Sequence, residues 1–351
     1  MISRHGALGA TFTPGKLAGS SAAIVLAAAV PLLYRDPYGL GVLVTMLTIM
    51  LLNVSWSFLL GVAGVWNFGQ LAIYAVGGYG AGLSILHLGL TPWLALPVAG
   101  VAGAALAVAI AIPTLRLSGI YTALLTFSAA QVVQLLIQND TSGLTGGALG
   151  LPGVPGLFAS LSPLESAQRY YWLCLAIVVV AVAISAVVVR SPFGLALRTV
   201  RESVAYSAAR GIDVHRSRVV AFAASGFFAS VAGALYTIYN GSMTPTVMGL
   251  TPMSVYVAML VVGGLGTVTG PIIGTVVITG IQQALIDRPG TQLTVLGTIL
   301  LLIAIFLPRG IASECSRLWD RVKLLIEEEE EEEPEPALAG EPAGRPQRPA
   351  A

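Results

Sequence analysis

Amide side chains occur at helical spacing within an apolar stretch, residues 118–138. Gln131, Gln134 and Gln138 are spaced i, i+3 and i+7, so a helix would place them on one face. An unpaired amide facing lipid is costly, and we expect these side chains to face the interior of a bundle. There they would either line a path for a solute or join helices by hydrogen bonds. A second stripe with the same two roles, in residues 67–89, consists of Asn67, Gln70 and Tyr74.

The longest charged segment between apolar stretches is residues 190–218. Pro192 and Gly194 should end the preceding span, and the sequence predicts a short helix from Leu195 to Ala209 that Gly211 stops. The charged residues exposed on it would be Arg198, Arg201 and Glu202. Such a helix can dock in a groove of a cytoplasmic partner and transmit motion as a rigid unit. The alternative is a positively charged loop that only fixes the orientation of the spans.

Residues that carry enzyme chemistry are scarce. The histidines are scattered, no metal-ligand or catalytic-triad spacing occurs, and the two cysteines, Cys174 and Cys315, indicate no disulfide framework. A phosphate-binding loop is absent, and the only lysines are Lys16 and Lys323. We therefore expect no catalytic residue, metal or cofactor in this chain. The central parts of the apolar stretches also lack charged residues and histidine, which disfavours a proton-driven carrier but leaves open a sodium site made of carbonyls and hydroxyls.

The elements that must position these residues are membrane-spanning helices. The 351 residues are 56% hydrophobic and 10% charged, against about 25% charged residues in soluble domains. We predict an all-α transmembrane bundle of about ten spans. The predicted spans are 18–34, 39–61, 67–89, 93–113, 118–138, 170–189, 219–240, 252–268, 271–286 and 291–307.

The basic residues predict the orientation. With a cytoplasmic N-terminus and leaving out the distal tail, thirteen basic residues fall inside and only three, Arg35, Arg169 and Arg288, fall outside. Both termini should therefore be cytoplasmic. Cytoplasmic loops between the spans also account for the clustered arginines better than nucleic-acid binding does. The predicted organisation is a cytoplasmic segment 1–17, a transmembrane domain 18–310 with the charged loop 190–218, and a cytoplasmic tail 311–351. Its acidic run, Glu327 to Glu333, is typical of a solvated, disordered segment.

Small residues occur in three patterns. Ala221, Ser225, Ala229 and Gly233 recur every fourth residue and predict a helix surface that another helix approaches closely. A glycine-rich interruption between two short apolar segments indicates either helices broken at membrane depth to line a cavity or a tight turn between spans. It consists of Gly263, Gly264, Gly266, Gly270 and Pro271. A comparable interruption, which suggests two related halves, consists of Gly61, Gly64 and Gly69.

Six stretches, in consistent order between about residues 40 and 310, resemble one transporter family. They are GVAGVWNFGQLAIYAVGGYGAG at 61–82, LRLSGIYTALLTFSAAQVV at 115–133, NDTSGLTGGALGLPG at 139–153, SPFGLALRTVRES at 191–203, AFAASGFFASVAGALY at 221–236 and VVGGLGTVTGPIIG at 261–274. The family is that of the branched-chain amino-acid permeases of ABC importers, and the chain most resembles the second of their two homologous permease subunits.

This resemblance implies a bacterial inner-membrane pore of two related permease subunits, with an external solute-binding protein. It also implies two cytoplasmic ATPases, which would bind the ATP and Mg. The residues expected to couple to an ATPase are Arg198, Arg201, Glu202, Ala205, Ala209 and Gly211. The expected path residues are the two polar stripes together with Gly264 and Gly266.

Two departures from the family pattern concern the substrate. Asn67 to Gln70 replaces a Ser-Leu-Gly-His stretch, and Gln131 occupies a position that is often acidic. The uncharged spans suit a neutral or zwitterionic solute. The resemblance implies branched-chain or other apolar amino acids as the first expectation, and urea or a short amide, which a related permease group handles, as the second. A sodium-coupled carrier and a structural scaffold are the contrasting hypotheses.

Overall fold

The computed structural model describes residues 14–117, 119–267 and 269–287, and positions 290, 294–295, 297–298, 301–302 and 310–311. For residues 14–23 only the backbone is described. The predicted cytoplasmic segment 1–17, the acidic run, Cys315 and the predicted span 291–307 lie wholly or mostly outside these residues.

The described residues are mostly helical. The long helices are α1 (Pro14–Leu33), α2 (Pro37–Ser57), α3 (Gln70–Leu88), α4 (Pro92–Thr114), α5 (Ile120–Gln138), α6 (Pro163–Arg190) and α9 (Val214–Asn240). The short ones are α7 (Pro192–Glu202), α8 (Val204–Ala209), α10 (Leu250–Gly263) and α11 (Gly270–Ala284). A π-helical turn, η1 (Phe58–Val62), extends α2, and 3-10 turns occur at η2 (Gly147–Leu149) and η3 (Pro245–Met248). Strands β1 (Leu151–Pro152) and β2 (Ser242–Met243) pair antiparallel, with Leu151 opposite Met243.

Six helices in the described part of the chain are long and apolar enough to cross a membrane. They are α2 with η1, α3, α4, α5, α6 and α9. Two shorter apolar helical segments, Ile24–Leu33 and Leu250–Gly263, accompany them. The chain is thus a polytopic helical membrane protein, and the predicted total of about ten spans stays a prediction.

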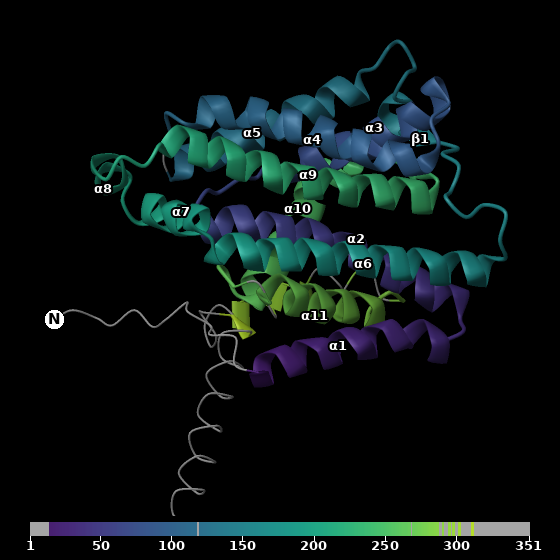
Figure 1. Cartoon of the computed structure of the whole chain (residues 1–351). Coiled ribbons are helices and arrows are strands. Elements are labelled where there is room, and N and C mark those ends of the chain that lie inside the picture. Colours follow the sequence, from purple (N-terminus) through teal and green to yellow (C-terminus); the bar gives the residue numbers. More distant parts are fainter. Residues whose placement is uncertain are drawn as a thin grey trace, which may run out of the picture.

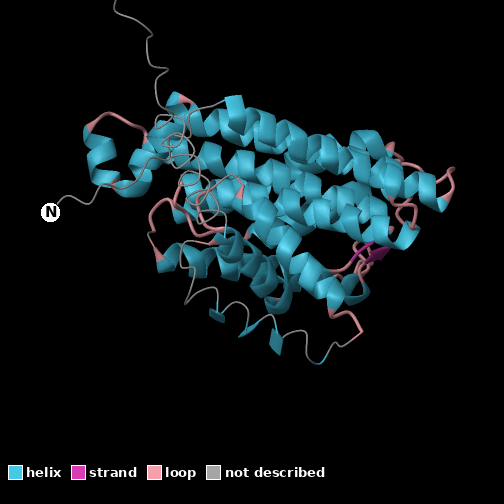
Figure 2. Cartoon of the chain, turned by 90° about the horizontal axis from the view of Figure 1, so that it is seen from below, coloured by secondary structure: helices cyan, strands magenta, loops and turns pink. Residues whose placement is uncertain are grey.

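The long helices lie side by side, and the irregular elements gather at the two ends of the bundle (Figure 1). Helices α7 and α8 lie at one end, and β1 lies at the other. The view from below shows the same separation, with the small β-ladder at one end of the helices (Figure 2). The two ends therefore have different structures, as expected for a protein that faces two compartments.

Helix α9 is the centre of the packing, with its main neighbours α3 and α4. The predicted small-residue stripe of Ala221, Ser225, Ala229 and Gly233 is buried on α9. A Cβ added at Gly233 would lie 1.8 Å from the carbonyl oxygen of Tyr74. The packing role predicted for this stripe is therefore confirmed, because only a small residue lets these two backbones approach so closely.

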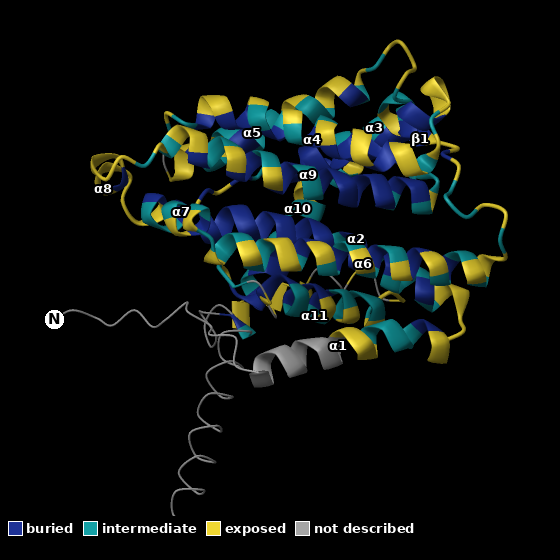
Figure 3. Ribbon diagram, in the orientation of Figure 1, coloured by how far each residue is buried: buried dark blue, intermediate teal, exposed yellow. Residues whose placement is uncertain are grey.

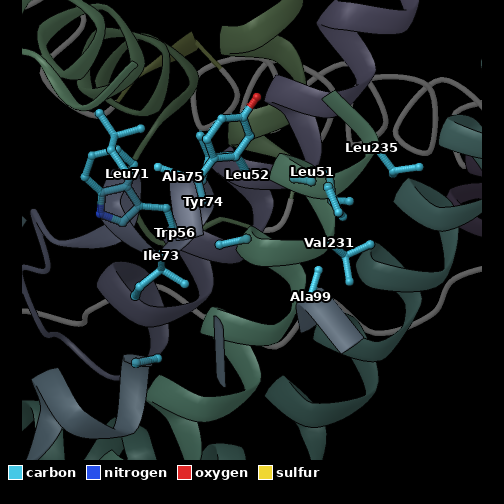
Figure 4. Close-up of a cluster of buried hydrophobic side chains, with 14 of the residues drawn as sticks. Leu51, Leu52, Trp56, Leu71, Ile73, Tyr74, Ala75, Ala99, Val231 and Leu235 are labelled. Atoms are coloured by element: carbon cyan, nitrogen blue, oxygen red, sulfur yellow. The ribbon is translucent and has the colours of Figure 1, made fainter. Parts of the chain in front are cut away.

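Large side chains fill the space where the backbones diverge. Trp56, Tyr74 and Phe222 are among the largest fully buried side chains. They belong to a continuous apolar cluster, part of which lies where α2 and α3 meet α4 and α9 (Figure 4). Helices α2, α3 and α9 are mostly buried, whereas α5 and α6 expose much of their surface (Figure 3). The exposed residues of α5 and α6 include Leu124, Leu136 and Val187, so these faces suit lipid or a second subunit.

Local sequence explains where the helices begin. Proline stands in the first turn of α2, α4, α6, α7 and α11, where its missing N–H has no intrahelical partner. Ser162 and Glu165 form a capping box at α6, with the Ser162 hydroxyl accepting from the Glu165 N–H at 3.3 Å.

Two predicted elements need correction. The single helix predicted from Leu195 to Ala209 is in fact two helices, since Ser203 adopts an extended conformation (φ −157°, ψ 113°) between α7 and α8. Its hydroxyl accepts from the Tyr206 N–H and caps the second helix, an alternative that hydropathy does not reveal. The span predicted from residue 67 begins at Gln70, so Asn67 belongs to the preceding turn.

The glycine-rich interruptions are both breaks in helical structure. Helix α10 ends at Gly263, and α11 begins at Gly270 after two glycines with positive φ, Gly264 (107°) and Gly266 (87°). The other break follows η1, where Gly64 has φ 68°. Residues other than glycine rarely adopt these φ values.

We expect Gly233→Ala to destabilise the bundle by about 1–3 kcal/mol, because the new methyl group would overlap the Tyr74 carbonyl. Gly280→Ala is the matched control, since Gly280 is also helical but has no atom within 4 Å of an added Cβ. Thermal unfolding of the purified protein should show a lower Tm for Gly233→Ala alone. Equal Tm values for both variants would contradict the close packing of α9 on α3.

Candidate functional site

Helices α7 and α8 form a surface at one end of the bundle that remains largely open. On α7, Gly194, Leu197 and Val200 are buried, which fixes this helix against the bundle. The six residues expected to couple to an ATPase are exposed, except Arg198, which is half-buried. Val204 and Tyr206 on α8 are exposed as well. An anchored helix followed by an open one is an arrangement that a partner protein can push.

Short-range interactions hold this surface in shape. The Ser191 hydroxyl accepts from the Gly194 N–H at 3.2 Å and caps α7. Gly211 ends the segment with φ 78°, as predicted from its position after the alanines. Asp213 then caps α9 by accepting from the Arg216 N–H at 2.9 Å.

Arg201 joins α7 to the first glycine-rich break. Its aliphatic chain lies against Gly64, where an added Cβ would be 2.4 Å from the Arg201 Cγ. Its Nη1 donates a hydrogen bond to the backbone carbonyl of Gly61 in η1. In a π-helical turn some backbone groups lack their usual partner, and a guanidinium can supply a donor for such a carbonyl. Arg201 therefore connects α7 to the end of the α2–η1 span.

The two glycine-rich breaks also touch each other. A Cβ added at Gly61 would lie 2.6 Å from the Gly266 Cα, so the backbones are in direct contact there. Sequence analysis identified both breaks but gave no sign that they meet. The structure thus brings together α7, η1 and the turn between α10 and α11.

The polar stripe that begins at Asn67 forms an internal hydrogen-bond network. The Asn67 amide donates to the Gln70 Oε1 at 2.9 Å, and the Gln70 Nε2 donates to the hydroxyls of Ser55 at 3.1 Å and Ser225 at 3.0 Å. Asn67 and Gln70 are at most 1% exposed. The network joins α2, α3 and α9, so these two amides serve at least as links between helices.

The third residue of that stripe, Tyr74, is also fully buried. Its ring lies 6.0 Å from the ring of Tyr236 on α9. A separate polar contact, which sequence analysis missed, lies at Asn53 on α2: its amide donates to the Thr275 hydroxyl at 2.9 Å and contacts the Met259 sulfur at 3.2 Å. An asparagine within an apolar run was the available signal for this link to α10 and α11.

The glutamines of α5 have a different environment. Gln131, Gln134 and Gln138 are half-buried, and they follow the boundary between the buried and the exposed side of the helix. Only Gln131 has a described hydrogen-bond partner, the Met248 carbonyl at 3.5 Å. The two glutamine-containing stripes therefore do not meet in one internal site.

The loop after α5 is ordered by one carboxylate. Asp140 accepts hydrogen bonds from Ser142 and from the Thr145 N–H, the latter at 2.6 Å. These bonds hold the pKa of the Asp140 carboxyl well below its usual range, with the Ser142 hydroxyl as the main cause. Among the described residues, no group of three or more His, Cys, Asp or Glu side chains is placed to hold a metal ion.

The network around Gln70 predicts a loss of stability. Gln70→Leu should cost about 1–3 kcal/mol, because the Asn67 amide would lose its buried acceptor. Gln134→Leu is the control, since Gln134 is a half-buried glutamine on α5. The Tm of this variant should differ little from that of the wild type. Both effects are measured by thermal unfolding of the purified protein. A Gln70→Leu variant as stable as wild type would rule out a stabilising role for the network.

Comparison with known proteins agrees with the architecture. Residues 38–305 match the family described as the branched-chain amino acid transport system / permease component. The chain is 27% identical over 285 residues to the high-affinity branched-chain amino acid transport system permease protein LivM of Escherichia coli K12, covering 75% of this chain and 67% of the relative. LivM of Salmonella typhimurium LT2 gives the same identity and coverage.

The chain is also similar to permeases named LivH. The probable branched-chain amino acid transport permease protein LivH of Methanocaldococcus jannaschii is 28% identical over 277 residues, covering 74% of this chain and 86% of the relative. No solved structure shows significant similarity to the chain. The family predicted from the sequence motifs is confirmed: the chain belongs to the branched-chain amino-acid transport permeases of ABC transporters.

Proposed function

We propose that this protein is one of the two homologous permease subunits of an ATP-driven importer in the bacterial inner membrane. It forms half of the path for branched-chain or other apolar amino acids, and its α7–α8 surface docks on a cytoplasmic ATPase. The observation that carries the coupling role is the position of Arg201, which links α7 to the η1 break. Family membership supports transport as the activity.

The charge distribution supports the proposed orientation. The end that bears α7 and α8 carries Arg190, Arg198, Arg201, Arg210, Arg216 and Arg218, whereas the loop 139–162 at the opposite end contains no basic residue. By the positive-inside rule the α7–α8 end is cytoplasmic. The opposite end, with the loop ordered by Asp140 and the pairing of β1 with β2, is then the face on which the external solute-binding protein docks.

The exposed faces of the bundle support a second permease subunit and a path between the subunits. Helix α5 leaves an apolar face open, and its glutamines follow one edge of that face. A homologous subunit on this face would cover the glutamines, so that their amides line a path for a neutral or zwitterionic solute. Gly264 and Gly266 also belong to the proposed path, where the break between α10 and α11 would change conformation during transport. The roles of Asn67, Gln70 and Tyr74 as path residues also remain a proposal, since their side chains are buried within this chain.

A reconstituted system tests the transport function. The chain should be co-expressed with its partner permease, two ATPases and the binding protein, and inserted into proteoliposomes. Leucine uptake should require ATP and binding protein, and it should not depend on a sodium gradient. Sodium-driven uptake by this chain without ATPases would contradict the proposal, and uptake of urea in place of leucine would contradict the substrate.

The coupling role of Arg201 gives a sharper test. Arg201→Met keeps an aliphatic side chain against Gly64 but removes the hydrogen bond to Gly61, so transport should fall by about tenfold while ATPase subunits still co-purify. Arg210→Met is the control, because the Arg210 guanidinium lies over the Tyr206 ring at 5.1 Å within the same surface segment. Leucine uptake per ATP hydrolysed is the measurement. Equal coupling in the two variants would show that Arg201 does not connect the ATPase to the spans.

A further inference from the structure

A cavity of about 230 Å³ lies beside the junction of α7 and α8. One water needs about 10–15 Å³ of such volume, so the cavity has room for several waters or for a small ion. Its walls come from the turn after η1, the end of α4, the start of α5, the α7–α8 junction and the first turns of α9. The lining residues at the centre of the argument are Trp66, Gly119, Thr122, Arg201, Glu202 and Arg218.

Arg218 lines this cavity and has a buried N–H group without a described partner. Its Nε is buried and has no hydrogen-bond partner among the described residues. No described carboxylate forms an ion pair with its guanidinium. The Arg218 side chain as a whole is half-buried. A buried N–H donor without a partner is costly, and it is normally satisfied by an anion or by water.

Two further donors face the same cavity. Arg201 uses Nη1 for the Gly61 carbonyl, and its other guanidinium N–H groups make no described hydrogen bond. The 19-residue helix α5 begins at Ile120 without a side-chain cap, and its N-cap residue, Gly119, lines the cavity. The free N–H groups and the positive end of the helix dipole at such a terminus favour an anion.

Glu202 is the only described carboxylate in the lining, and it is exposed. Glu202 and Arg201 are both exposed, so solvent screens both charges, whereas it screens the buried part of Arg218 much less. The net charge of the three ionised residues is +1, so an anion is still favoured inside.

We propose that this cavity binds a phosphate group, held by Arg218, Arg201 and the N-terminus of α5. Guanidinium groups match the geometry of phosphate oxygens, and each can donate two parallel hydrogen bonds. The group belongs either to an anionic phospholipid or to a soluble phosphate. Trp66 at the cavity is 42% exposed, and tryptophan at the level of the headgroups is typical of a membrane interface. The placement of the site at the cytoplasmic leaflet depends on the proposed orientation, but phosphate binding does not.

Thermal unfolding of the full chain in detergent tests the site. Dioctanoyl-phosphatidylglycerol should raise the Tm by roughly 2–4 °C, whereas dioctanoylglycerol, which has the same chains without the phosphate group, should not. Inorganic phosphate, compared with chloride at equal ionic strength, forms the second arm. A shift with the lipid alone identifies a headgroup site, and a shift with both probes identifies a site open to soluble phosphate as well.

Substitutions test whether a change in Tm arises from binding in the cavity. Arg218→Gln should abolish the shift, and Arg218→Lys should retain part of it because the positive charge remains. Arg216→Gln is the matched control, since Arg216 is exposed on the same helix and does not line the cavity. The proposal is overturned if neither probe raises the Tm, if dioctanoylglycerol acts as strongly as the phospholipid, or if Arg218→Gln shifts as wild type does. Transport plays no part in these measurements, so their failure is distinct from failure of the proposed function.

Discussion

The contact between two glycine-rich breaks is the constraint on which the rest of the molecule depends. Gly61 at the end of the α2–η1 span meets Gly266 in the turn between α10 and α11. An added Cβ at Gly61 would lie 2.6 Å from the Gly266 Cα, and Gly266 itself has a φ of 87°, which favours glycine. Buried backbone groups that leave regular helical structure need other hydrogen-bond partners. Arg201 supplies such a partner by donating to the carbonyl of Gly61, which is a buried residue. The packing of α7 on the bundle therefore also stabilises the backbone at the glycine-rich breaks.

The bundle around this contact is held by close backbone approach and a few buried amides. Lipid chains are as apolar as leucine, so burying apolar side chains does little to bring helices together in a membrane. Small residues on α9 allow α3 and α4 to approach, and the Gln70 network adds directional bonds among α2, α3 and α9. Asn53 provides the corresponding link from α2 to α10 and α11. Helix α2 is thus joined by side-chain hydrogen bonds to α3 and α9 and, separately, to α11.

Sequence analysis succeeded where one local property decides the structure. Hydropathy located the long helices, and fourfold spacing identified the packed face of α9, because both depend on residues within one helix. It failed where a single side chain chooses between two local structures: the Ser203 hydroxyl starts a new helix within a run that reads as continuous. It also could not pair distant segments, so the contacts of Arg201 with Gly61 and of Asn53 with Thr275 were not foreseen. The role of the α5 glutamines depends on a surface that this chain alone does not cover.

The placement of Arg201 gives it two physical tasks that compete. Its Nη1 completes the backbone at Gly61, while the rest of its guanidinium faces the cavity that Arg218 also lines. An anion in that cavity would draw the guanidinium toward Arg218 and thereby bias the position of α7 relative to η1. A ligand can shift such an equilibrium only through a difference in its affinity for the two arrangements. Arg201 lies on α7 and Arg218 lies on α9, so a movement of α7 relative to α9 changes the distance between the two cations, and this would supply the required difference.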